Sequence, residues 1–419
     1  MHSSTLEGAI EASASTASIA SAPSCGEGTL ESPPKKRPTG VLRAATITGW
    51  GFLSVMVSFL SLSWFGVEWC FHPCVVLLRH RTETHVERLV PMEHTWTEDN
   101  LESLQSHILS EEQKHPGATG EFTWIISAIS LAAKAIGNKV RCARIQDVIG
   151  DAGDVNVQGE MQQKLDVISN EIIMRCLGNR DNVGVLASEE NETPLLLRRR
   201  DEGGRYAVLF DPLDGSSNLD VSVGVGTIFS VLRLSNEGSR EEAMLQKGAN
   251  QVAAGYVLYG SSTVLVLTTG NGVAMFVLDQ AIGSFVLVAK SLQIPSGNKT
   301  YSTNEAYTDG YSSGLQNYLK WAHKNEYSSR YIGSMVADVH RVLLKGGVFL
   351  YPPTADKPDG KLRLMYEANP MALIIEQAGG KAVAGDDRIL DIVPKGLHQR
   401  TSVILGSVDQ VDAILSHTT

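Results

Sequence analysis

The alternation of hydrophobic and polar positions divides the chain into three stretches. Residues 1–43 are rich in Ser, Ala, Gly, Thr and Pro and have no sustained period, so we expect them to be disordered. Residues 44–67 contain no charged side chain over about the length that crosses a bilayer. From Thr97 onward apolar residues recur at helical and strand periods, which indicates a folded region.

The folded region combines helices with strands. Apolar residues first recur at helical spacing, and a series of apolar runs with the length of strands follows. After Pro295, predicted helices alternate with predicted strands. The predicted helices are 122–136, 158–177, 336–344 and one running from Asn369 to Gly379, and the predicted strands are 183–187, 206–210, 221–234, 251–269, 273–287 and 348–351. We expect Asn369 to cap its helix and Pro370 to be the first helical residue. The pattern predicts an α/β protein with a domain boundary near residue 292.

One stretch in the middle of this pattern carries two acids. The apolar run 206–210 is followed by Asp211, Pro212 and Asp214. Because proline cannot donate to a sheet ladder, we expect the strand to end at Pro212, with both carboxylates at its carboxyl end. The Gly-Ser-Ser turn at 215–217 can hold an anion, and two carboxylates beside an anion require a cation such as Mg²⁺. Taken alone, the stretch also fits a solvated Asx-type turn.

Further acids follow other predicted elements. They are Glu189 and Glu190 after the strand 183–187, Glu367 before the helix at Asn369, and Glu160 and Asp166 on or near the helix 158–177. Strand ends and helix starts are where open α/β sheets bind ligands. If these carboxylates converge, their repulsion raises their pKa values unless cations are bound. Clustered Mg²⁺ ions suit the hydrolysis of a phosphate monoester, a reaction that is very slow without catalysis.

Charge and cysteine content narrow the choice of partners. The chain has 36 basic and 46 acidic residues and a net charge of −10, which argues against nucleic acid as a partner of the folded part. The charges of residues 1–90 cancel, so the excess lies in residues 91–419. Five cysteines without a C-x-x-C pair fit a reducing compartment. Cys142 and Cys176 are expected to pack as small apolar residues.

Residues 1–91 are predicted to be a low-complexity extension with a candidate targeting or membrane segment at 44–67. Basic residues before this segment and tryptophans near its ends are typical of a signal anchor, whereas its Ser, Thr and Gly content and Glu68 are not. Translation from Met92 would omit the extension. We expect a cytoplasmic protein that could contact a membrane only through 44–67, and the alternative is an organelle-targeted or membrane-anchored protein.

Six segments of the folded part form a recognisable set. They are GEMQQKLD at 159–166, SEEN at 188–191, FDPLDGSSNLD at 210–220, YSTNEAY at 301–307, RYIGSMVADVHR at 330–341 and GKLRLMYEANPMA at 360–372. In order and spacing they resemble the fructose-1,6-bisphosphatase family over about residues 97–417. The resemblance implies a layered αβαβα sugar-phosphatase fold with two mixed-sheet subdomains, 92–292 and 293–419. It also implies Mg²⁺-dependent hydrolysis of the 1-phosphate of fructose 1,6-bisphosphate.

The resemblance implies roles for the clustered acids. The metal ligands would be Glu160, Glu189, Asp211, the Leu213 carbonyl, Asp214 and Glu367, holding two to three Mg²⁺ ions per subunit with Mn²⁺ as a substitute. Asp166 and Glu190 match the pair that activates the attacking water, with Arg363 as a further catalytic residue. The family often has Asp at the position of Glu160, which puts the third metal site in doubt.

The resemblance also implies sites for both phosphates and for a regulator. The 1-phosphate would contact Gly215, Ser216 and Ser217, with Arg363 and Lys361 nearby, and the sugar and 6-phosphate would contact Asn304, Tyr307, Tyr331, Tyr351 and Arg330 of a neighbouring subunit. The borrowed arginine implies a homo-oligomer, in the family usually a tetramer. An inhibitory AMP site would comprise Thr119, Gly120, Glu121, Thr123, Arg205, Tyr206 and Arg233. Each tyrosine taken alone also fits ordinary packing.

Two other hypotheses remain open at this stage. A sedoheptulose-1,7-bisphosphatase is the nearest enzymatic alternative, with inositol-monophosphate and nucleotide-bisphosphate phosphatases further away. An inactive relative that senses a metabolite or acts as a scaffold is the alternative from another class, and the presence of every acid that the chemistry requires argues against it.

Overall fold

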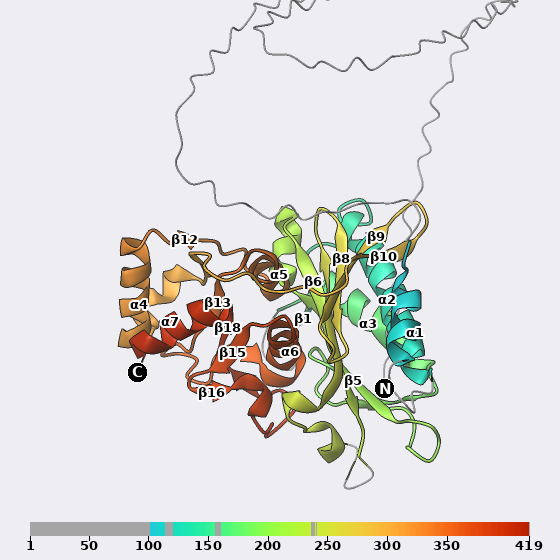
Figure 1. Ribbon diagram of the computed structural model, residues 1–419. Coiled ribbons are helices and arrows are strands. Elements are labelled where there is room, and N and C mark those ends of the chain that lie inside the picture. The colour runs from blue at the N-terminus through green and yellow to red at the C-terminus, as the bar shows by residue number, and fades with distance from the viewer. Residues whose placement is uncertain (1–100, 114–119, 156–160, 236–238, 240, 419) are drawn as a thin grey trace, which may run out of the picture. The chain divides into compact units, whose positions relative to one another are not determined.

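Two large β-sheets and the helices that cover them form the folded part of the protein (Figure 1). The computed structural model describes residues 101–113, 120–155, 161–235, 239 and 241–418. The extension 1–91 and the candidate membrane segment 44–67 lie outside these residues. Within the described part of the chain, no helix is both long and apolar enough to cross a membrane.

The first large sheet is mixed and has the strand order β10-β9-β8-β7-β6-β5-β3-β4. Its neighbouring strands are antiparallel except for β3 and β5, which are parallel. The strands are β3 (Val183–Ser188), β4 (Leu195–Leu196), β5 (Tyr206–Asp214), β6 (Val225–Arg233), β7 (Gln251–Tyr259), β8 (Thr263–Thr268), β9 (Val273–Asp279) and β10 (Ser284–Ala289). The predicted strand 221–234 begins later than expected because residues 216–221 form a 3-10 turn.

The second large sheet has the order β12-β11-β13-β18-β15-β16. Its parallel pairs are β11 with β12 and β11 with β13, and the other pairs are antiparallel. The strands are β11 (Thr300–Ser302), β12 (Ser328–Ser329), β13 (Val348–Tyr351), β15 (Lys381–Ala384), β16 (Asp387–Arg388) and β18 (Val403–Gly406). Two small sheets pair β1 (Asp151–Val155) with β2 (Met161–Gln163) and β14 (Leu362–Arg363) with β17 (Arg400–Thr401).

The helices and sheets stack in five layers, αβαβα, as the resemblance implies (Figure 1). The helices are α1 (Leu104–Glu112), α2 (Glu121–Arg141), α3 (Lys164–Gly178), α4 (Ser313–Lys324), α5 (Met335–Lys345), α6 (Asn369–Gln377) and α7 (Val408–Thr418). The first three pack on the outer face of the eight-stranded sheet. Helices α5 and α6 lie between the two sheets, and α4 and α7 cover the outer face of the second sheet. The predicted fold class is therefore confirmed.

The predicted helix 158–177 begins later than expected. Residues 161–163 form β2, and α3 starts at Lys164. The residue before it, Gln163, has an extended backbone (φ −84°, ψ 148°) and forms a capping box with Asp166. The Asp166 carboxylate accepts a hydrogen bond from Gln163 N at 2.9 Å. This reciprocal cap fixes the start of the helix and overrides the helical spacing of the preceding residues.

The predicted cap of the last site helix is wrong. Residues Leu364–Ala368 form a π-helical turn that leads directly into α6. Asn369 already has helical dihedral angles (φ −61°, ψ −51°), so it cannot be the cap, and Pro370 is the second residue of the helix. Proline has no N–H to donate, and it is tolerated in this first turn of regular α-helix.

The first large sheet ends along the chain with β10 at Ala289, and the second begins with β11 at Thr300. The two large sheets therefore share no strand. All described residues nevertheless belong to one compact unit. The boundary near residue 292 therefore stays a prediction.

Candidate active site

The parallel pair β3 and β5 brings the first acids together. In their register Ser188 lies opposite Phe210, and Glu189 N donates to the Phe210 carbonyl at 3.0 Å. Glu189 follows Ser188 and Asp211 follows Phe210, so the two acids lie beside each other. Both are buried. Two carboxylates at one sheet edge are the arrangement that the strand-end pattern predicts.

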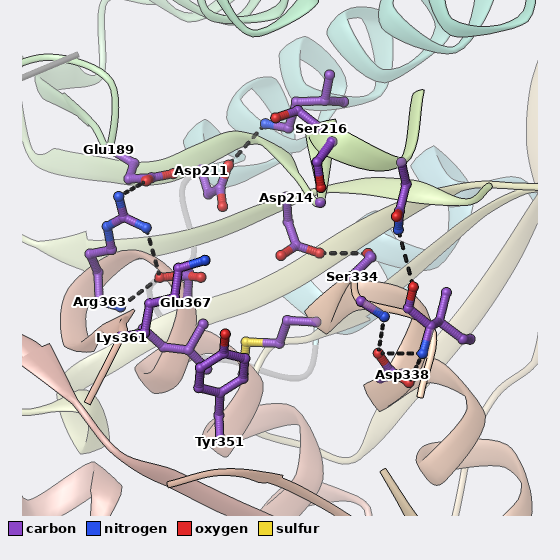
Figure 2. A pocket seen from close by; sticks show the side chains of 18 of the residues that line it. Glu189, Asp211, Asp214, Ser216, Ser334, Asp338, Tyr351, Lys361, Arg363 and Glu367 are labelled. Atoms are coloured by element: carbon purple, nitrogen blue, oxygen red, sulfur yellow. Dashed lines mark hydrogen bonds and ion pairs between the residues drawn. The ribbon is translucent and has the colours of Figure 1, made fainter. Parts of the chain in front are cut away.

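The strand that carries Asp211 and Asp214 does not end at Pro212, which corrects the prediction. β5 continues to Asp214, and its pairing with β6 is irregular between the two acids. At such a bulge a residue can lack a ladder hydrogen bond, so the missing N–H of proline is tolerated. The Pro212 carbonyl instead accepts a hydrogen bond from Thr227 Oγ1 at 2.8 Å. The bulge places Asp211 and Asp214 toward one cavity (Figure 2).

Glu367 approaches the same acids from the π-helical turn. It is 3% exposed, and its Oε2 accepts a hydrogen bond from Arg363 N at 2.5 Å. One carboxylate oxygen from each of Asp211, Asp214 and Glu367 lies within 4.8 Å of the others. Buried carboxylate oxygens this close are hard, negatively charged ligands, which is the donor set that Mg²⁺ and Mn²⁺ prefer. The residues present therefore fit a divalent cation.

Lys361 also lines this cavity, and the buried Arg363 lies directly among the acids. Its Nη2 is 2.5 Å from Glu189 Oε1, and its Nη1 is 3.9 Å from Glu367 Oε2. The side chain is buried, and Figure 2 shows it between the two carboxylates. One guanidinium carries a single positive charge, so it offsets only part of the negative charge of the cluster.

Burial raises the pKa of every carboxyl in this cluster. The pKa of Glu189 is raised to about 8 and that of Glu367 to about 7, and the Arg363 charge opposes both shifts. Burial and then the charge of Glu189 raise the pKa of Asp211 well above its ordinary value. Burial also raises the pKa of Asp214. At neutral pH the cluster holds protons that a bound cation would displace.

Asp166 and Glu190, the predicted pair for activating water, line the same cavity. Asp166 is 4% exposed at the start of α3, where it also serves as the cap described above. Glu190 Oε2 accepts a hydrogen bond from Gln162 Nε2 at 2.6 Å. Both carboxylates are therefore held by neighbouring groups at the edge of the acid cluster.

The cavity has a volume of about 530 Å³ and brings most of the predicted site residues together. Those that line it are Asp166, Glu189, Glu190, Asp211, Leu213, Asp214, Gly215, Ser216, Ser217, Asn304, Tyr307, Tyr331, Tyr351, Lys361, Arg363 and Glu367. Arg330 is exposed and is not part of the lining, and its Nη1 donates to the Ser329 carbonyl at 2.8 Å. Glu160 lies outside the described residues.

Two buried residues of the cavity carry no clear signal in the sequence. Ser334 Oγ donates to Asp214 Oδ2 at 2.7 Å (Figure 2), and Asp338 accepts hydrogen bonds from the loop before α5 and from Ser302 of β11. Ser334 also caps α5. A serine just before a helical pattern signals such a cap, but nothing local signals that its hydroxyl reaches Asp214.

The predicted AMP residues gather around the first turn of α2. Gly120 precedes the helix in the left-handed conformation (φ +73°), and Thr123 N donates to Glu112 Oε1 at 3.1 Å. Within the described part of the chain, the buried Thr123 hydroxyl has no hydrogen-bond partner. Thr119 lies outside the described residues.

Basic and aromatic residues complete this second cluster. Arg205 Nη1 is 3.0 Å from Glu121 Oε1, and Tyr206 lies opposite Arg233 in the pairing of β5 with β6. Burial raises the pKa of Tyr206, and the nearby Arg233 charge opposes the shift. The charges of Arg205 and Glu121 are paired and partly exposed, unlike those of the acid cluster.

The five layers and the acid-lined cavity define the class of sugar phosphatases. Two family models match the chain: the fructose-1-6-bisphosphatase N-terminal domain over residues 102–290 and the fructose-1-6-bisphosphatase C-terminal domain over 294–419. The chain belongs to the fructose-1,6-bisphosphatase family.

Individual relatives agree with this assignment. The chain is 50% identical over 322 residues to a class 1 fructose-1,6-bisphosphatase of Chloroherpeton thalassium, covering 74% of this chain and 92% of the relative. It is 48% identical over 320 residues to that of Chlorobium phaeovibrioides, covering 74% and 96%. The crystal structure of Leishmania major fructose-1,6-bisphosphatase in holo form has a TM-score of 0.73 at 42% identity, covering 76% of this chain and all of that one.

Proposed function

We propose that the protein hydrolyses the 1-phosphate of fructose 1,6-bisphosphate, giving fructose 6-phosphate and inorganic phosphate. The observation that carries this proposal is that one cavity holds both an acid cluster and a second group of side chains with amide and hydroxyl donors, in a chain of this family. The relatives from Chloroherpeton and Chlorobium carry the same activity in their names.

The acid cluster is the proposed reaction centre. Glu189, Asp211, Asp214 and Glu367 would hold Mg²⁺, with Mn²⁺ as a substitute. When bound, such ions polarise the phosphoryl group and lower the pKa of water. Gly215 precedes a short 3-10 turn of six residues, and Gly215, Ser216 and Ser217 line the same cavity as Asp214. These residues would bind the 1-phosphate.

The chain's own residues would move the proton. In this proposal the pair Asp166 and Glu190 accepts one proton from the attacking water, whose oxygen forms a bond to phosphorus as the bond from phosphorus to the sugar oxygen breaks, and the released sugar oxygen takes up a proton from solvent. Because the pKa values of Glu189 and Glu367 are raised, these two carboxyl groups tend to keep their protons when no cation is bound. Arg363 would contact the transferred phosphoryl group and stabilise its negative charge.

The far end of the cavity would hold the phosphate that is not cleaved. Asn304, Tyr307, Tyr331 and Tyr351 line the cavity and would form this end, where they offer amide and hydroxyl donors. We propose that Arg330 completes the same site in a neighbouring subunit. Its exposure outside the cavity of its own chain supports this assignment and a tetrameric assembly. A cytoplasmic location and inhibition by AMP at the α2 cluster are further parts of the proposal.

A comparison of substrates tests the proposed function. Phosphate release should be measured with fructose 1,6-bisphosphate, sedoheptulose 1,7-bisphosphate and inositol monophosphate at saturating Mg²⁺. We expect the highest kcat/KM with the fructose compound. A higher kcat/KM with the sedoheptulose compound would assign the protein to the alternative enzyme. No release from any of the three would support the inactive relative.

A further inference from the structure

Asp338 is a buried carboxylate in the cavity for which neither the acid cluster nor the phosphate sites provide a role. It lies in the first turns of α5 and is 1% exposed. Its oxygens accept hydrogen bonds from Ser302 Oγ at 2.7 Å, from Ile332 N at 3.0 and 3.2 Å, and from Gly333 N at 3.0 Å. Three donors from two separate segments therefore meet at one side chain.

Each of the two segments lies next to a residue that lines the cavity. Ser302 ends β11 and lies two residues before Asn304, whereas Ile332 and Gly333 directly follow Tyr331. Asn304 and Tyr331 both line the cavity. The Asp338 carboxylate thus ties the segment of Asn304 to the segment of Tyr331, although the two are far apart in sequence.

The loop before α5 uses this carboxylate as the acceptor for its backbone. Gly333 has a positive φ of +87°, so residues 331–333 leave regular structure just before α5. The N–H groups of Ile332 and Gly333 are only partly buried, and an ionised carboxylate accepts their hydrogen bonds more strongly than a neutral group would. Burial raises the pKa of Asp338 to about 6, and its hydrogen bonds oppose the shift, so the group is mainly ionised at pH 7. An ionised acceptor is therefore available to hold the loop.

The same loop is held on its other side by the acid cluster. Asp214 Oδ2 accepts hydrogen bonds from Ser334 Oγ at 2.7 Å and from Val336 N at 2.9 Å. Figure 2 shows the loop between Asp214 and Asp338, with Asp338 on the side away from Glu189 and Arg363. Asp214 thus acts at the reacting end and Asp338 at the far end.

We propose that Asp338 is a positioning residue that sets the separation of the Asn304 and Tyr331 segments and thereby the affinity for the phosphate that is not cleaved. This inference rests on the proposed function, because it assigns the far end of the cavity to that phosphate. Asp338 would not contact the reacting atoms, so it should affect KM much more than kcat.

The test is Asp338→Asn with two substrates. The amide keeps one acceptor oxygen but places an NH₂ group toward a backbone N–H, so one hydrogen bond is lost. We expect the KM for fructose 1,6-bisphosphate to rise about tenfold and kcat to change less than about twofold. The kcat/KM for fructose 1-phosphate, which lacks the second phosphate, should stay unchanged. In calorimetric titrations, fructose 6-phosphate should bind about tenfold more weakly.

Two further variants provide the controls. Ser302→Ala removes a single donor, so we expect a smaller rise of KM, about threefold, again only with the bisphosphate. Asp387→Asn makes the same chemical change at an exposed position of β16 and should leave both substrates unaffected. Thermal unfolding of each variant shows whether the fold is retained.

The outcomes separate positioning from a purely structural role. An equal loss of kcat/KM with both substrates, or an unchanged KM for the bisphosphate, would overturn the inference. If Asp338→Asn does not fold, Ser302→Ala decides: a KM rise confined to the bisphosphate supports the inference, and its absence refutes it. A wild-type protein that does not hydrolyse the bisphosphate would refute the proposed function itself, and the inference with it, before any variant is made.

Discussion

The acid cluster of the cavity and the charged cluster at the start of α2 are both candidate anion sites, but they differ in burial and in charge balance. In the cavity, Asp211, Asp214 and Glu367 are buried, and one arginine lies among them. At α2, Glu121 is paired with Arg205, and both side chains are partly exposed. Buried charges interact strongly and exposed pairs are screened by water, so changes in the cavity should have much larger effects.

The largest effect is expected for Asp214→Asn. Loss of this carboxylate should lower kcat/KM by about 10³-fold or more, because a metal contributes several kcal/mol of charge stabilisation. The fold should persist, since the amide oxygen can still accept the hydrogen bonds from Ser334 and Val336. Phosphate release and thermal unfolding are the measurements.

Asp220→Asn is the matched control, because Asp220 is exposed in the turn that comes after Asp214. It should retain activity. Normal activity in Asp214→Asn would refute the metal assignment.

An intermediate effect is expected on stability in the absence of metal. The pKa of Glu189 is raised from 4.5 to about 8 in the folded protein, and that of Glu367 from 4.5 to about 7. The stability that such groups contribute is fully present below about pH 4.5 and is lost as the pH rises toward 8. The unfolding temperature without metal should therefore fall over this range, and saturating Mg²⁺ should reduce the fall.

Glu189→Gln isolates this contribution, because it removes the carboxyl whose pKa is raised to about 8. Without metal, its unfolding temperature should depend less on pH than that of the wild type. An equal dependence in the two proteins would contradict the assignment.

The smallest effect is expected at the α2 cluster. Thr123 N donates to Glu112 Oε1, so an acid already lies where a phosphate of AMP would bind. Glu112→Gln keeps an acceptor but removes the charge, and AMP should then bind about threefold more tightly. Isothermal titration with AMP is the measurement.

The exposed acid Glu171 on α3 supplies the control, since Glu171→Gln should leave AMP binding unchanged. Weaker binding by Glu112→Gln would contradict this interpretation. No response of wild-type activity to millimolar AMP would remove the AMP site from the proposal.

The sequence is sufficient to predict the fold class and most of the cavity, for a physical reason. Acids that come directly after apolar runs are expected at or near strand ends, and the ends of adjacent parallel strands meet at one sheet edge. Glu189 and Asp211 come together in this way. Their convergence with Glu367 depends on the resemblance, because no local pattern places a residue from the far end of the chain beside them.

The wrong predictions concern contacts that form only in the folded state. Pro212 is predicted to end a strand, but a bulge accommodates it. Asn369 is predicted to cap a helix that in fact continues from the preceding turn. Ser334 and Asp338 are not predicted, because a hydroxyl or a carboxyl can bond many groups, and the sequence does not say which of them lie near.

The π-helical turn Leu364–Ala368 has a consequence for how this site could be lost in evolution. A π-helical turn corresponds to one extra residue inserted into an α-helix. Deleting one residue there would restore regular helix and rotate the residues before the deletion by about 100° relative to those after it. Glu367 would then leave its partners Asp211 and Asp214, while α6 kept its place in the core. A one-residue deletion in this turn should therefore remove Glu367 from the acid cluster without removing α6 from the core.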